Sequence, residues 1–127
     1  MYIYKLECIK NGRVYIGQTI NAERRKKQHF WCLRRGIHYI ELLQSDFDTY
    51  GETAFTYSVL CKASKWTIRC EDGVRRPESS ACERAMMEKY KSYLPEYGYN
   101  YKDQYFYPHG EKRGKARQVK ATDKEAP

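Results

Sequence analysis

The sequence predicts an α/β domain in which a small, mainly antiparallel three-stranded sheet is flanked by three or more helices. Apolar and polar residues alternate in two segments near the N-terminus and again at residues 55–59. Between and after these segments, apolar residues recur at every third or fourth position. Alternation is typical of a strand and the longer spacing of a helix, so the expected order is two strands, two helices, a strand and a helix.

The first two strands are predicted to form a hairpin. Residues 1–9 and 13–17 alternate, and Asn11-Gly12 between them is a dipeptide that two-residue hairpin turns favour. One face of the first strand carries Tyr2, Tyr4, Leu6 and Cys8. Phe55, Tyr57 and Val59 alternate in the same way and predict the third strand.

Two helices are predicted between the hairpin and the third strand. Asn21 can cap a helix that runs to about Arg35, and Gly36 stands where such a helix ends. A shorter helix is predicted from about Tyr39 to Tyr50, and Gly51 occupies the position of a left-handed cap.

The C-terminal half is predicted to hold a loop, one more helix and a tail. Residues 62–76 show no clear period, which indicates a loop or a loop with a short added hairpin. Helical spacing then returns until Pro95 and Gly98 end it, with a buried stripe of Cys82, Met86, Tyr90 and Tyr93. We expect residues 1–109 to form one domain and residues 110–127, which have hardly any large apolar side chain, to form a basic flexible tail.

Composition narrows the class of protein. The 127 residues include 24 Lys and Arg against 16 acids, a formal charge of +8, and 13 tyrosines. A basic and aromatic chain indicates a nucleic-acid partner, although a solvated charged surface explains the charge equally well. Five cysteines without a C-x-x-C pair argue against a disulfide framework or a zinc knuckle. Without a signal peptide or a membrane-spanning run, we expect a cytoplasmic protein with no membrane partner.

Two polar side chains interrupt the apolar face of the first helix. Arg25 and His29 share that face with Ala22 and Leu33. They are one turn apart, so both side chains reach the same patch beside the hairpin. Taken alone, such a pair is more often structural than catalytic.

Tyr4 and Tyr15 lie on the two hairpin strands. With a two-residue turn, Tyr15 pairs with Cys8 and both phenols project from one face. That register leaves the tyrosines about 13 Å apart along the strand. A wider turn or a bulge is therefore needed to bring them together. Either tyrosine, taken singly, could simply pack in the core.

Glu83 is the only acid near the start of the apolar stripe on the last helix, where it could face a cleft. The run Ser80-Ala81-Cys82-Glu83 also fits a capping box, in which Glu83 reaches back to the Ser80 amide. Glu88 lies on another face of the helix and is the alternative carboxylate.

Together these residues resemble the GIY-YIG endonucleases, a family named after two short strand motifs. The first motif is Tyr2-Ile3-Tyr4 here, with tyrosine where the family usually has glycine, and the second is intact as Tyr15-Ile16-Gly17. The further matches, in chain order, are Arg25, His29, Gly36-Ile37-His38, Asp46-Phe47-Asp48-Thr49-Tyr50-Gly51, Glu83 and Gly98-Tyr99-Asn100. The resemblance covers residues 1–102, with its elements in the family's order. The loop of residues 61–80 is longer than is usual in the family.

The resemblance implies a metal-dependent endonuclease that hydrolyses phosphodiester bonds in DNA. Glu83 would hold a single Mg²⁺ or Mn²⁺, and Arg25 would clamp the phosphate. Tyr4 would act as general base or deliver the water, with its pKa lowered by Arg25 or the metal. Tyr15 and His29 would position the phosphate and relay the proton.

Supporting roles are implied for three further residues. Gly17 and Asn100 resemble structural supports of the site, and His38 a substrate contact. The tail would add phosphate contacts that do not depend on base sequence, unless it is only a solvated terminus. Its basic residues are Lys112, Arg113, Lys115, Arg117 and Lys120.

A phage-type nuclease, either homing-like or stand-alone, acting in a bacterial or phage-infected cell, is the leading subtype. The alternatives are a structure-specific repair or restriction nuclease, and a DNA-binding module without turnover, for which Tyr2 in place of glycine is the sequence sign. A basic protein with no nucleic-acid role is a further alternative. Because no second DNA-binding motif accompanies the domain, specificity is weak, resides in residues 61–80 or comes from a protein partner.

Overall fold

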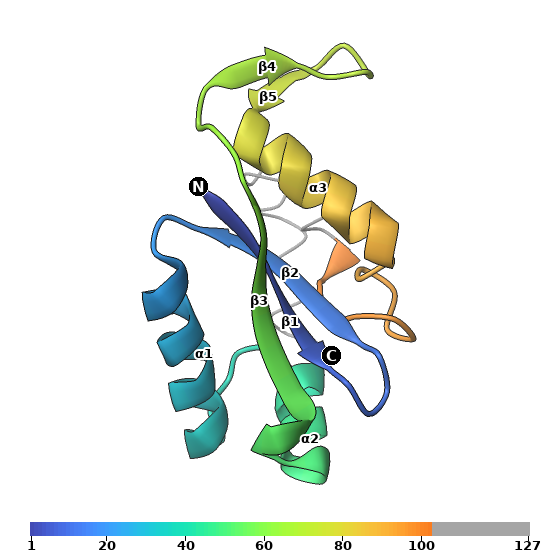
Figure 1. Cartoon of the computed structure of the whole chain (residues 1–127). Coiled ribbons are helices and arrows are strands. Elements are labelled where there is room, and N and C mark those ends of the chain that lie inside the picture. Colours follow the sequence, from blue (N-terminus) through green and yellow to red (C-terminus); the bar gives the residue numbers. More distant parts are fainter. Residues whose placement is uncertain (103–127) are drawn as a thin grey trace.

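A computed structural model of the chain describes residues 1–102 (Figure 1). The expected tail, residues 110–127, and the end of the expected domain lie outside the described residues. A three-stranded antiparallel sheet stands at the centre, as the sequence predicts. β1 (Tyr2–Cys8) is its middle strand, between β2 (Val14–Thr19) and β3 (Phe55–Lys62).

The β1–β2 hairpin has a wider turn than the two-residue turn that Asn11-Gly12 favours. Leu6, and not Cys8, pairs with Tyr15, and Tyr4 pairs with Gly17. The connection therefore takes up residues 9–13. The predicted pairing of Tyr15 with Cys8 was therefore wrong. In the observed register the partner of Tyr15 lies two residues from Tyr4, so the wider turn brings the two tyrosines close together.

Local capping chemistry defines α1 (Ala22–Arg35) as the sequence predicts. The Asn21 side chain accepts the Arg24 amide at 3.0 Å, which satisfies one of the amides at the start of the helix. Gly36 ends the helix with a φ of 74°, in the left-handed region.

The second helix, α2 (Glu41–Tyr50), begins two residues later than expected. Gly51 has a φ of 85° but a ψ of 166°, so the left-handed cap predicted there does not form. A short 3-10 turn, η1 (Glu52–Ala54), follows instead and leads into β3.

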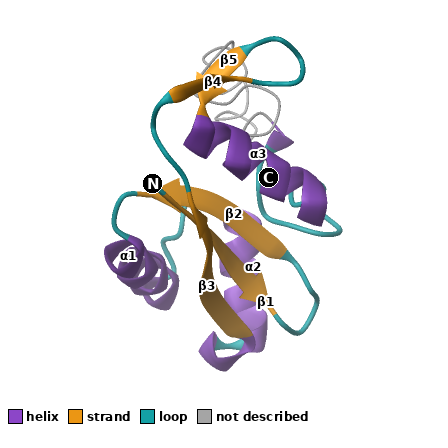
Figure 2. Ribbon diagram, turned by 45° about the horizontal axis from the view of Figure 1, so that its top comes forward, coloured by secondary structure: helices purple, strands orange, loops and turns teal. Residues whose placement is uncertain are grey.

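Both faces of the sheet are covered (Figure 2). On one face, α1 and α2 pack against side chains of β1 and β2, and the buried residues are Tyr4, Leu6, Cys8, Tyr15, Phe30, Leu33, Ile40, Leu43, Phe47, Ala54, Phe55 and Tyr99. On the other face, Met87 of α3 (Glu78–Tyr90) packs against Ile3, Val14 and Ile16. Alternate side chains of β1 therefore enter two different hydrophobic cores. Tyr4 and Tyr15 belong to the core that α1 and α2 cover.

The last helix differs from its prediction at both ends. It starts at Glu78, and it ends at Tyr90 with Lys91 in a left-handed cap, so Pro95 lies beyond it. Met87 is its fully buried apolar residue, and the expected stripe of Cys82, Met86, Tyr90 and Tyr93 is only partly buried.

A separate two-stranded ribbon stands beyond the start of α3, at the top of Figure 1. It consists of β4 (Thr67–Arg69) and β5 (Arg75–Pro77), the added hairpin that the sequence left open. All five cysteines are free, as expected. Within residues 1–102, no helix has the length and apolar character that crossing a bilayer needs.

Candidate active site

The two tyrosine motifs form a single structural unit. Tyr4 is 1% exposed, and its ring lies over Gly17 on the neighbouring strand. A Cβ atom on Gly17 would lie 2.5 Å from the Tyr4 hydroxyl oxygen, so only glycine leaves room for the phenol. The ring centroids of Tyr4 and Tyr15 are 6.1 Å apart. Tyr15 also lies within hydrogen-bond distance of Tyr39, with 3.2 Å between the hydroxyl oxygens.

From Tyr4 a chain of hydrogen bonds runs through two buried histidines. The Tyr4 hydroxyl lies 2.8 Å from Nε2 of His29, and Nδ1 of His29 lies 2.8 Å from Nε2 of His38. The backbone N–H of Ile40 donates to Nδ1 of His38 at 3.1 Å. We call these four residues the histidine chain.

The Ile40 amide sets the direction of every proton in the histidine chain. Because this amide can only donate, Nδ1 of His38 accepts, and a neutral His38 carries its proton on Nε2. That proton is donated to Nδ1 of His29, which in turn carries its own proton on Nε2 and donates it to Tyr4. Tyr4 thus accepts from His29 and directs its own hydroxyl proton to another group.

Burial holds the histidine chain in its neutral form. Burial lowers the pKa of His29 to about 3, with smaller contributions from His38 and Arg25, and it lowers the pKa of His38 to about 4. Burial also raises the pKa of Tyr4 and of Tyr15 well above 10, and Arg25 opposes this only in part at Tyr4. In this environment the Tyr4 phenol is a proton donor at neutral pH, whereas a general base would need a lower pKa.

Arg25 lies half-buried on α1, one turn before His29. It lines a concavity of about 520 Å³ together with Arg24, Lys27, Trp31, Tyr39 and other residues of α1 and the following turn. Within residues 1–102, no carboxylate forms an ion pair with Arg25. Its guanidinium can therefore bind an anion that enters the concavity.

Glu83 lies in the second turn of α3. Nε2 of Gln18 on β2 donates to a Glu83 carboxylate oxygen at 2.8 Å. The charge of Glu83 makes a small contribution to the raised pKa of Tyr4 and of Tyr15, behind burial and the neighbouring phenols. The capping-box prediction was wrong, because the helix already starts at Glu78.

The alternative carboxylate, Glu88, lies elsewhere. It is exposed and lines a groove between α3 and the β4–β5 ribbon. Gln18 was missed in the sequence, although strand alternation places it on the face opposite Gly17, where α3 packs. Tyr39 was also missed as a partner of Tyr15, since the bond depends on the loop between α1 and α2.

The supporting residues have distinct places. The buried Asn100 side chain bonds both the N–H and the C=O of Ile16, each at 2.9 Å, and so holds its segment against β2. His38, only 6% exposed, contacts His29 and also lines the concavity that contains Arg25. Tyr2 is partly buried, with the Lys62 ammonium 5.4 Å from its ring centroid.

The fold is that of a small nuclease catalytic domain. The family model described as the GIY-YIG catalytic domain matches residues 1–93, and the chain belongs to the GIY-YIG family. It is 36% identical over 58 residues to "Intron-associated endonuclease 1" of Enterobacteria phage T4. That match covers 46% of this chain but only 23% of the relative.

Two solved structures share the fold. One is the catalytic domain of intron endonuclease I-TevI in a mutant form, with a TM-score of 0.60 and 26% identity over 79% of this chain and 93% of that chain. The other is the catalytic domain of homing endonuclease I-TevI, with a TM-score of 0.60 and 24% identity over 79% of this chain and 99% of that chain. The α/β class expected from the sequence is thereby confirmed.

Proposed function

We propose that this chain is a metal-dependent DNA endonuclease that hydrolyses phosphodiester bonds, of the phage type and either homing-like or stand-alone. The observation that carries the proposal is the histidine chain, which ends in the protonated Tyr4 phenol, with Arg25 one helical turn before His29. Phosphodiester hydrolysis needs positive charge at the phosphoryl oxygens and a proton for the leaving oxygen. The subtype is supported by the phage T4 relative, which is an intron-associated endonuclease by name.

Each side chain has a role that follows from its position. Arg25 binds the phosphoryl oxygens through its planar guanidinium. Tyr4 donates its hydroxyl proton toward a phosphoryl or leaving oxygen, and His29 stabilises the negative charge that then develops on Tyr4 by donating to it. His38 positions His29 and fixes its tautomer, because the hydrogen bond at one ring nitrogen of a histidine determines which nitrogen carries the proton. Tyr15 adds a second phenol on the same face.

Glu83 fits the single ion, Mg²⁺ or Mn²⁺, that the family resemblance implies. Hard cations of this kind take one or two carboxylates and complete their shell with water and phosphate oxygens. The Glu83 carboxylate, held by Gln18, can supply one such ligand. Within residues 1–102 no group of three or more His, Cys, Asp or Glu side chains gathers. When bound, the ion would supply positive charge to the phosphoryl group.

The deciding experiment is nicking of supercoiled plasmid with Mg²⁺ or Mn²⁺. Glu83→Gln and Arg25→Ala should each lower the rate by about 100- to 1000-fold, as expected for groups that stabilise transition-state charge. Matched controls on the same two helices, Glu88→Gln and Lys26→Ala, should retain activity. Circular dichroism establishes that all four variants fold.

Other outcomes select among the alternatives. Binding without cleavage in every metal would favour a DNA-binding module. Cleavage confined to branched DNA would favour a repair nuclease, and cleavage that appears only with an added protein would identify a partner for specificity. Loss of activity in Glu88→Gln but not in Glu83→Gln would identify Glu88, and not Glu83, as the metal ligand. A cytoplasmic site of action, in a bacterial or phage-infected cell, belongs to the same proposal.

A further inference from the structure

The β4–β5 ribbon carries two arginines directly opposite each other. Its register pairs Arg69 with Arg75 and Ile68 with Arg76. Because side chains alternate along a strand, Arg69 and Arg75 share one face with Thr67, and all three are exposed. We call this the arginine face. The opposite pair, Ile68 and Arg76, lines the groove toward α3, and Arg69 lines this groove as well.

Two like charges in directly opposite positions destabilise an antiparallel pair of strands. The ribbon does not neutralise them itself, because within residues 1–102 no carboxylate forms an ion pair with Arg69 or Arg75. The Arg69 side chain donates to the Gly73 carbonyl, at 3.2 Å. The acid in the turn, Asp72, is held instead by Arg76, with bonds of 3.0 and 3.1 Å that lower the pKa of Asp72 to about 2. In the part of the chain that the structure describes, neither arginine of this face is thus paired with a carboxylate.

The ribbon is also joined firmly to the helix that carries Glu83. The Glu78 amide donates to the Trp66 carbonyl and the Ser79 amide to the Ser64 carbonyl, both at 2.8 Å. The Glu78 carboxylate accepts the Ser64 amide at 3.0 Å. Glu83 follows five residues after Glu78, about 7.5 Å along the helix axis. The arginine face therefore has a fixed place relative to the proposed metal ligand.

We propose that the arginine face binds the phosphate backbone of a DNA duplex beside the bond to be cut. The proposal rests on the proposed function, since it takes DNA as the substrate. Charge complementarity supports it: two paired guanidiniums meet a polymer that carries one negative charge per 3.4 Å along each strand. A two-stranded ribbon also has the width that a major groove accepts. Phosphate contacts of this kind fix the register of a protein on DNA without reading its sequence.

The test is the binding of a fluorescein-labelled duplex, measured by anisotropy in EDTA so that no cleavage occurs. The probe variant is Arg69→Gln with Arg75→Gln. The control, Lys10→Gln with Lys89→Gln, removes the same charge from exposed positions at the hairpin turn and the last turn of α3. We expect the probe to weaken binding by about tenfold at 150 mM salt and to reduce the slope of log K against log salt by about 1.8, for two lost phosphate contacts.

The outcomes separate this proposal from the proposed function. If probe and control lose the same affinity and salt slope, the arginine face is not a binding surface, even though the nuclease proposal stands. If the unmodified chain binds no duplex at any salt concentration, both the arginine-face proposal and the proposed DNA endonuclease function are contradicted. A sole-tryptophan variant, Trp31→Phe, adds a second measurement, because Trp66 is 83% exposed at the base of the ribbon. Binding of DNA should change the fluorescence of Trp66. An unchanged emission spectrum at saturating DNA would contradict contact at the ribbon.

Discussion

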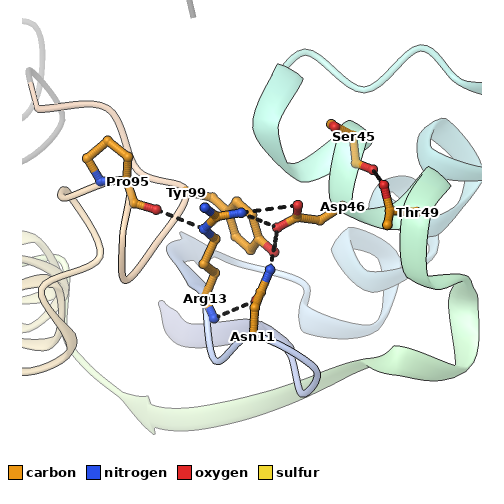
Figure 3. Close-up of polar contacts among 7 residues, drawn as sticks. All are labelled: Asn11, Arg13, Ser45, Asp46, Thr49, Pro95 and Tyr99. Carbon is orange, nitrogen blue, oxygen red and sulfur yellow. Dashed lines mark hydrogen bonds and ion pairs between the residues drawn. The ribbon is translucent and has the colours of Figure 1, made fainter.

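Two buried polar networks lie at opposite ends of the central sheet, and they differ in how completely they satisfy their own groups. At the hairpin end, the Asp46 carboxylate of α2 accepts from Asn11, Arg13 and Tyr99 at 2.6 to 3.1 Å (Figure 3). Arg13 also donates to the Pro95 carbonyl at 2.8 Å. At the other end, the histidine chain leads to a phenol whose proton is directed to another group.

The difference separates a structural network from a functional one. The Asp46 network closes on itself and ties the hairpin, α2 and the segment after α3 together, so its polar groups hold the fold. The histidine chain instead keeps two buried imidazoles neutral, at a cost in stability whenever they must take up protons. Variants should therefore damage stability at one end and cleavage at the other.

The largest effect should come from Tyr4→Phe. Removing the hydroxyl keeps the ring over Gly17 but deletes the proposed proton donor, so the nicking rate should fall by about 100- to 10,000-fold. The free energy of unfolding should change by only about 1 kcal/mol. Both are measured on the same preparation, by plasmid nicking and urea unfolding.

Tyr57→Phe is the control for Tyr4→Phe. Tyr57 stacks on Tyr4 with centroids 4.9 Å apart, but its hydroxyl donates to the Ala22 carbonyl and lies outside the histidine chain. Its nicking rate should stay within about threefold of the unmodified chain, well short of the loss expected for a proton donor. An equal loss in both variants would show that packing, and not the proton, is what matters.

A smaller effect, and on stability alone, is expected for Asp46→Asn. The substitution keeps the shape of the side chain but leaves the partly buried Arg13 without its partner, which should cost about 2 to 3 kcal/mol in urea unfolding. Cleavage per folded molecule should be unchanged. Asp48→Asn on the exposed side of α2 is the control and should cost less than about 1 kcal/mol. A cleavage defect in folded Asp46→Asn would show that the Asp46 network also contributes to catalysis and would contradict the separation of the two networks.

The smallest effect concerns pH. The folded-state pKa values of His29 and His38, about 3 and about 4, lie below the ordinary 6.5, so the unfolded chain binds more protons below pH 6.5. Their contribution to stability is complete above pH 6.5, falls as the pH falls, and levels off below pH 3. Between pH 7 and pH 6 the two histidines together should remove about 1 to 1.5 kcal/mol.

Urea unfolding at the two pH values measures this difference. In the double variant His29→Gln with His38→Gln, the histidine contribution disappears and the stability should change less between pH 7 and pH 6. An identical pH dependence in both proteins would mean that folding leaves the pKa of both imidazoles unshifted.

Local chemistry made the elements of the fold predictable. The Asn21 cap and the Gly36 end define α1 from side-chain and backbone preferences that act within one turn. Alternation likewise identified the strands. The turn at Asn11-Gly12 failed as a guide to register, because Asn11 and Arg13 are engaged by Asp46, far away in the sequence. A tertiary interaction therefore outweighed a local turn preference.

The candidate site was predictable in its members but not in its connections. Arg25 and His29 stand out as polar groups on a helix face that should be apolar, and the structure brings Nε2 of His29 within 2.8 Å of the Tyr4 hydroxyl. The bonds of His29 to His38 and of Gln18 to Glu83 join elements whose relative placement no local pattern encodes. The raised pKa of Tyr4 also follows from burial, which depends on the whole domain.

The close approach of Gly17 to Tyr4 makes the two motifs a single evolutionary unit. The phenol occupies the volume that any side chain at position 17 would need, so neither position can drift alone. A lineage that acquired alanine at position 17 would have to lose the ring at position 4 or reset the strand pairing, and with it the proton donor. In an alignment of relatives, the two positions should therefore change together or not at all.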